Sequence, residues 1–174
     1  MRILIILVPD GDARAGQQPT LRFERFLEPY YLFRDAGADV VLASLAGGDP
    51  AMRTATGKRR DTSSIMLRFR QDQAARDALV DTLELTQVDP DDFDGAFCIG
   101  VAGSIWPPRV EGPVGRMIGG LLASGKPVAV VPAQIDLEPL GAGDGLLIVG
   151  DRAQAPVLAA KALLGALNGA PVGE

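Results

Sequence analysis

The amino-acid sequence predicts a doubly wound α/β domain, in which helices cover both faces of a mainly parallel sheet of about five to six strands. The chain has 174 residues, a length typical of one domain. Short apolar runs alternate with segments of helical periodicity, as in successive βαβ units. The first apolar run, residues 3–8, is continuous and rich in isoleucine, which is typical of a central strand buried on both faces.

Five apolar runs are interpreted as strands and four segments as helices. The strands are expected at residues 3–8, 39–44, 94–99, 127–131 and 145–149. The helices are expected at residues 21–36, 71–85, 113–124 and from about Pro156 to 168–169. Since βαβ crossovers are right-handed, this order of elements favours a doubly wound sandwich.

Three local features of this interpretation can be checked against a structure. Pro29 lies inside the first helix and is expected to kink or divide it, because proline has no backbone N–H. The segment 47–61 is interpreted as an exposed loop, with an anion-binding loop as the alternative reading of its basic residues. In the second helix, the residues expected to face inward are Ala74, Ala78, Leu79 and Leu83.

The composition excludes several classes of function. The formal net charge is −5, and a negatively charged chain does not attract the phosphates of a nucleic acid. Nucleic-acid binding is therefore not expected. There is no histidine, which excludes Ser-His-Asp and Cys-His sites and the HExxH metal motif. The single cysteine excludes an internal disulfide framework and a cysteine-based zinc site.

No cofactor, metal or membrane segment is expected from the sequence. The glycines of Gly100-x-x-Gly103 and Gly141-x-Gly143-x-Gly145 do not follow the first strand, where the dinucleotide fingerprint belongs. No apolar run approaches the ~18 residues that span a bilayer. The opening apolar run is too short for a secretory signal, so a cytoplasmic protein is expected.

Five runs of residues form a characteristic series along the chain. They are Glu28-Pro29-Tyr30-Tyr31-Leu32-Phe33, Ala36-Gly37-Ala38-Asp39-Val40, Asp92-Phe93-Asp94-Gly95-Ala96-Phe97, Gly125-Lys126-Pro127-Val128-Ala129-Val130 and Gly145-Leu146-Leu147-Ile148-Val149-Gly150. In their order these runs resemble the ThiJ/PfpI superfamily, which includes intracellular proteases, glyoxalases, deglycase-like proteins and stress chaperones. The resemblance implies a flavodoxin-like sandwich formed by one domain, residues 1–174, and a homodimer.

The chain departs from the family pattern where the family's chemistry is located. The family's Cys-His-Gly elbow, a strand-to-helix turn that carries the nucleophile, is replaced by Val131-Pro132-Ala133. The family's Gly-Gly-His-Gly turn is replaced by Gly100-Val101-Ala102-Gly103. Only residues 132–144 stand where the family has a helix and a further strand, so the domain is shortened after the fourth strand. The resemblance therefore implies a fold without cysteine-dependent catalysis at its usual position.

Two carboxylates are candidates for catalysis without histidine. Glu24 lies near the position of a family glutamate that hydrogen-bonds the elbow cysteine, and Asp136 follows the fourth strand. Paired in one crevice, they could transfer protons as general acid and base. The alternative readings are a solvated glutamate on an amphipathic helix and a loop or capping aspartate.

Other residues are expected to line a binding crevice, since the loops at the carboxyl ends of strands hold ligands in such folds. Trp106 could stack on a ligand or pack its loop onto the domain. Cys98 lies within a predicted central strand and is interpreted as a small buried hydrophobe. The expected binding residues are Glu28, Gly100, Val101, Ala102, Trp106, Pro132 and Gln134.

Three functions follow as hypotheses. The first is a non-catalytic family member, a pseudoenzyme that binds a small molecule or a partner in the crevice. The second is a lyase, hydratase or isomerase that acts on a small carbonyl compound through carboxylates. The third is a holdase-like stress chaperone, whose sign would be a large exposed apolar patch.

Overall fold

A computed structural model describes residues 1–8, 21–50, 52–53, 63–100, 112–131, 145–149 and 155–169. The prediction of a loop at 47–61 falls mostly outside them, as do the candidates Val101, Ala102, Trp106, Pro132, Gln134 and Asp136.

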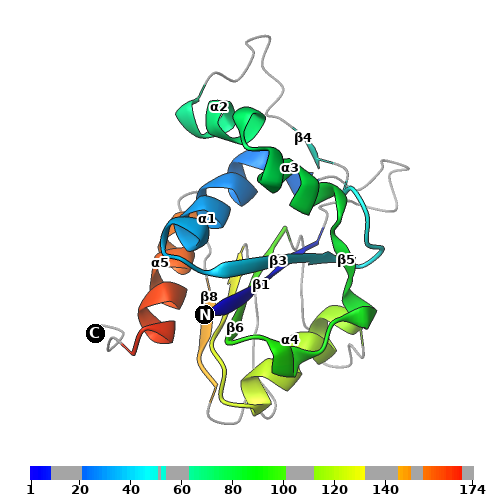
Figure 1. The fold of residues 1–174 in the computed structure, drawn as a ribbon. Helices are drawn as coiled ribbons and strands as arrows, with labels where there is room; N and C mark the ends of the chain where they lie inside the picture. The colour runs from blue at the N-terminus through cyan, green and yellow to red at the C-terminus, as the bar shows by residue number, and fades with distance from the viewer. Residues whose placement is uncertain are drawn as a thin grey trace.

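Within the described residues the main sheet has six strands, and every neighbouring pair is parallel. Their order across the sheet is β5-β3-β1-β6-β7-β8, with β1 and β6 at the centre (Figure 1). The prediction of a flavodoxin-like α/β fold is therefore confirmed, and so are its five strands. The strands are β1 (Arg2–Leu7), β3 (Asp39–Ser44), β5 (Leu83–Glu84), β6 (Gly95–Ile99), β7 (Val128–Val131) and β8 (Leu147–Val149).

Helices lie on both faces of this sheet, as the sequence predicts. Helices α1 (Phe23–Asp35) and α5 (Ala155–Leu167) pack on one face, and α4 (Pro113–Ala123) packs on the other (Figure 1). The 3₁₀ turns η2 (Leu85–Gln87) and η3 (Pro90–Asp92) lie beside α4. A separate pair of short strands, β2 (Leu21–Arg22) and β4 (Met52–Arg53), is also parallel.

The alternation of side chains along β1 explains why both faces need cover. Ile3, Ile5 and Leu7 point into the core under α1 and α5, whereas Leu4 and Ile6 point into the core under α4. All five are fully buried. Because successive side chains of a strand face opposite sides, a continuous apolar run is stable only between two layers of helices.

The prediction of one helix at 71–85 is wrong. The helix found in this range, α3 (Gln73–Val80), is shorter than predicted and is followed by β5. A separate helix that was not predicted, α2 (Ser64–Gln71), precedes it, with Asp72 between them in an extended conformation. The Asp72 carboxylate accepts a hydrogen bond from the Ala75 N–H at 3.0 Å, so this residue caps α3 and does not continue α2.

The expected inward face of that helix is partly wrong for the same reason. Ala74 is exposed and Ala75 is buried in its place, because α3 begins at its own cap. Leu79 is buried as expected, and Ala78 is half-buried. Leu83 lies in the edge strand β5, pairs with Ala43 and is 43% exposed.

Pro29 does not divide α1, which runs without interruption from Phe23 to Asp35. Of the two expected effects, division of the helix is therefore wrong, and a kink stays a prediction. The apolar face of α1 is buried on both sides of the proline, with Phe26 and Tyr30 5.2 Å apart between ring centroids. We attribute the continuity to this burial, which offsets the loss of one backbone hydrogen bond.

Candidate functional site

The order of the strands reverses between β1 and β6. The chain crosses from β1 to β3 on one side and from β6 to β7 on the other. At the carboxyl ends of these strands, the Val8 N–H donates to the Ile99 carbonyl at 2.8 Å, and the Gly100 N–H donates to the Val131 carbonyl at 2.9 Å. In open α/β sheets, ligands bind in the crevice that such a reversal produces.

Gly100 directly follows β6 at this edge of the sheet. Its φ angle is +88°, in the left-handed region that favours glycine, and the residue is buried. A side chain at this position would strain the backbone. The structure therefore places Gly100 at the edge where the sequence expects a binding crevice, and its contact with a ligand stays a prediction.

Val131 ends β7 as an ordinary strand residue. It pairs with Ile99, is 0% exposed and belongs to the core that packs under α1 and α5. Among the described residues only glycines have positive φ. Val131 therefore has neither the strained backbone of a nucleophile elbow nor a side chain that could attack a substrate.

Both candidate glutamates come from α1. Glu24 is the second residue of the helix, and its side chain lies outside what the structure describes. Glu28 lies one turn further along and is exposed. Since the last turn of α1 leads directly into the amino end of β3, its first turns lie toward the carboxyl edge of the sheet. Whether Glu24 meets Asp136 there stays a prediction.

Cys98 lies in the middle of β6 and faces the core under α4. It is 0% exposed, and burial raises the pKa of its thiol to about 12. Since the thiolate is the reactive form of cysteine, this thiol is inert near neutral pH. The structure thus agrees with the interpretation of Cys98 as a small buried hydrophobe.

We expect the free energy of unfolding to fall as the pH rises above about 9, where an unburied thiol ionises. In that range the unfolded chain loses the Cys98 proton while the folded chain keeps it, so the folded state binds more protons. The loss is at most about 1.4 kcal/mol per pH unit for one group and continues until the folded pKa near 12. Below pH 9 the contribution of the Cys98 thiol to the free energy of unfolding is fully present.

Urea unfolding of the wild type and of Cys98→Ala, at neutral pH and at several values above 9, isolates this effect. Tyr30 and Tyr31, whose pKa values burial also raises, are present in both proteins and cancel in the difference. The stability advantage of the wild type should shrink with rising pH. A difference that does not change with pH would contradict the assignment.

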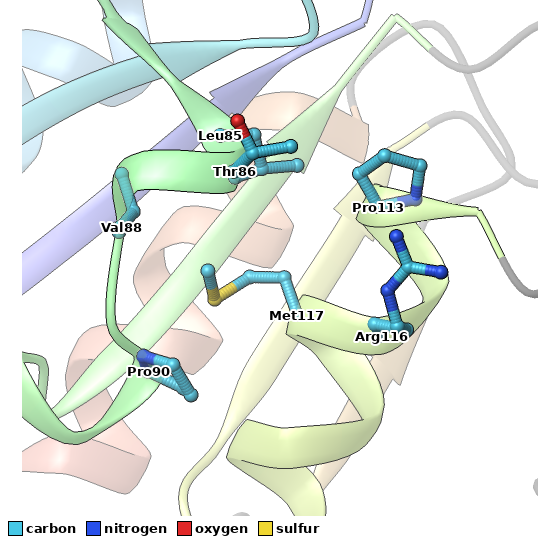
Figure 2. Close-up of a pocket in the computed structure, with 7 residues that line it drawn as sticks. All are labelled: Leu85, Thr86, Val88, Pro90, Pro113, Arg116 and Met117. Atoms are coloured by element: carbon cyan, nitrogen blue, oxygen red, sulfur yellow. The ribbon is translucent and has the colours of Figure 1, made fainter.

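A cavity of about 320 Å³ lies on the α4 side of the sheet, between the η2–η3 segment and the first turns of α4 (Figure 2). The sequence reasoning missed it, because no residue type marks a space between a 3₁₀ turn and a helix. Its lining residues are Leu85, Thr86, Val88, Pro90, Pro113, Arg116 and Met117.

Within the described ranges, no group of three or more His, Cys, Asp or Glu side chains is placed to hold a metal ion. No described helix is long and apolar enough to cross a bilayer.

Comparison with known proteins gives matches among solved structures alone. No family model matches the sequence, and no curated protein matches it. The rapid encystment protein of 24 kDa from Francisella tularensis is similar with a TM-score of 0.67 and 14% identity, covering 95% of this chain and 98% of that chain. Glyoxalase III from Candida albicans is similar with a TM-score of 0.62 and 14% identity, covering 95% and 96%. DJ-1beta from Drosophila melanogaster is similar with a TM-score of 0.57 and 20% identity, covering 98% and 92%. At these identities the likeness shows a shared fold.

Proposed function

We propose that this chain, which has the fold of the ThiJ/PfpI superfamily, is a small-molecule binding protein that works without a thiol. Its ligand is held at the carboxyl edge of the sheet, beside β1, β6 and β7. Val131 is the observation that carries this proposal. It occupies the position of the superfamily's elbow cysteine by resemblance, and it is a fully buried strand residue.

The remaining thiol offers no substitute for the missing nucleophile. Cys98 lies inside the sheet under α4, and its raised pKa keeps it protonated. A covalent intermediate on cysteine would need a thiolate exposed to the ligand. The reversal of strand order at β1 and β6 and the buried glycine turn at Gly100 nevertheless retain the geometry in which such folds bind ligands.

A second function is favoured by one observation. Glyoxalase III from Candida albicans shares the fold along nearly all of both chains. A lyase, hydratase or isomerase that acts on a small carbonyl compound could use Glu24 and Asp136 for proton transfer, since carboxylates serve in this role when burial raises their pKa.

Thermal unfolding in the presence of small aldehydes, ketones and oxo acids tests the proposal, with the same mixtures analysed by NMR for products. We expect at least one compound to raise the melting temperature without being converted. A ligand at a hundred times its dissociation constant stabilises the folded state by about 2.7 kcal/mol. Glu24→Gln and Asp136→Asn should reduce this stabilisation.

Asp92→Asn is the matched control, because Asp92 is exposed in η3, which precedes β6 at the opposite edge of the sheet. It should leave ligand stabilisation unchanged. If the protein converts a compound and Glu24→Gln abolishes that conversion, the binding function is wrong and the carbonyl enzyme is the better hypothesis. Suppression of client aggregation, with no compound stabilising the fold, would favour the holdase hypothesis instead.

A further inference from the structure

The cavity beside α4 lies between the η2–η3 segment and the first turns of the helix (Figure 2). At the Pro90 end, the proline ring lies against α4 at Gly120, where an added Cβ would be 3.4 Å from the Pro90 Cγ. Lys126 holds this contact by donating to the Pro90 carbonyl at 2.9 Å. Arg116 and Pro113 line the other end, at the first turns of α4.

Five of the seven residues that line the cavity are apolar. Leu85 and Met117 are buried, and the Met117 side chain extends from α4 toward η2 across the cavity (Figure 2). Val88 and Pro90 add further hydrocarbon surface from the opposite wall. A volume near 320 Å³ is at the lower end of the range for ligand pockets, so the cavity has room for a small molecule.

The two polar residues that line the cavity are Thr86 and Arg116. Arg116 is the one charged residue among the described residues that line it, and it is exposed. A guanidinium has five N–H donors and no acceptor, so it selects an anionic oxygen over a cationic or purely donating group. The Thr86 hydroxyl donates to the Glu84 carboxylate at 2.6 Å, which leaves its own oxygen as an acceptor.

We propose that this cavity binds a small carboxylate with a hydrocarbon body. The body lies between Met117 and Val88, and the carboxylate lies at the guanidinium of Arg116. This site is on the α4 side of the sheet and does not depend on the function proposed for the crevice.

Hexanoate is a suitable probe, and 1-hexanol and hexylammonium share its chain but differ in charge. Binding is followed by NMR on protein labelled at the methionine ε-methyl groups. The chain has 4 methionines, of which Met117 lines the cavity and Met66 is buried in the core on the opposite side of the sheet. We expect hexanoate to shift the Met117 signal in a saturable way and to leave the Met66 signal in place.

The order of affinity should be hexanoate, then 1-hexanol, then hexylammonium. Arg116→Gln should weaken hexanoate binding by about two- to five-fold, the range for an exposed ion pair, and should not change the affinity for 1-hexanol. Added salt should weaken hexanoate binding in the wild type alone. Arg70→Gln, on α2 at the far side of the sheet, is the matched control and should change nothing.

Three results would overturn the proposal. They are a Met117 signal that hexanoate does not move, hexylammonium binding as tightly as hexanoate, and equal weakening of hexanoate and 1-hexanol by Arg116→Gln. A failure of the crevice to bind carbonyl compounds would leave all three readouts unaffected.

Discussion

Replacing Phe97 with alanine is expected to lower the free energy of unfolding by about 4 kcal/mol. Phe97 lies in the middle of β6, is 0% exposed and meets Phe33 of α1 edge-on, with ring centroids 5.4 Å apart. The truncation removes the contact between the central strand and the helix above it and leaves a cavity that rigid neighbours cannot close. Urea unfolding of both proteins measures the change.

Two further variants separate this effect from a general sensitivity to truncation. Phe97→Leu retains most of the volume and should cost less than about 2 kcal/mol. Leu158→Ala removes a side chain of α5 that is 61% exposed and should change stability by less than about 0.5 kcal/mol. A loss below 1.5 kcal/mol for Phe97→Ala would mean that the layer between β6 and α1 repacks.

The sequence predicted the central strands well because their signal is local. Residues 3–8 and 94–99 are apolar at every or nearly every position, and both became strands that are buried on both faces. Their neighbours could also be placed, since glycine and proline mark where the intervening helices end. Gly37 and Gly125, at the ends of α1 and α4, both have positive φ, as expected of glycines after helices.

The region from 64 to 87 shows where sequence reasoning failed. Here one residue, Asp72, decides between one helix and two, because its side chain caps α3. The Asp72 carboxylate also accepts a hydrogen bond, 3.2 Å long, from the hydroxyl group of Tyr31, which lies 41 positions earlier in the sequence. The strand β5 has two residues and exists through its pairing with β3. Such long-range partners leave no trace in a window of neighbouring residues.

The candidate site could be predicted only in part, for a related reason. The lack of a nucleophilic side chain at Val131 was legible in the sequence, and the burial of Cys98 followed from its place in an apolar strand. The position of Gly100 at the edge of the sheet required only the topology. The α4 cavity could not be predicted. It exists because η3 and α4 touch at Pro90 and Gly120 and are further apart elsewhere, and tertiary packing sets that separation.

Gly145→Ala is expected to lower the free energy of unfolding by about 3 kcal/mol, at the upper end of the range for overpacking. The added Cβ would lie 2.5 Å from the carbonyl oxygen of Leu122 and 2.6 Å from its Cα. Both are backbone atoms near the end of α4, so no side-chain rotation relieves the clash. Gly145, which lies two positions before β8, would have to move away, and the hydrogen bond from the Val128 N–H to the Leu146 carbonyl, 2.8 Å long, would weaken.

Hydrogen exchange distinguishes this local mechanism from a general loss of stability. In Gly145→Ala the Val128 amide should exchange faster relative to amides of β1, because the β7–β8 edge opens first. Gly119→Ala is the matched control, since Gly119 lies inside α4 with nothing within 4 Å of the added Cβ. That variant should raise stability by about 0.5–1 kcal/mol, because alanine is the better helix former. If both variants behaved alike, the contact of Gly145 with Leu122 would not govern the position of β8.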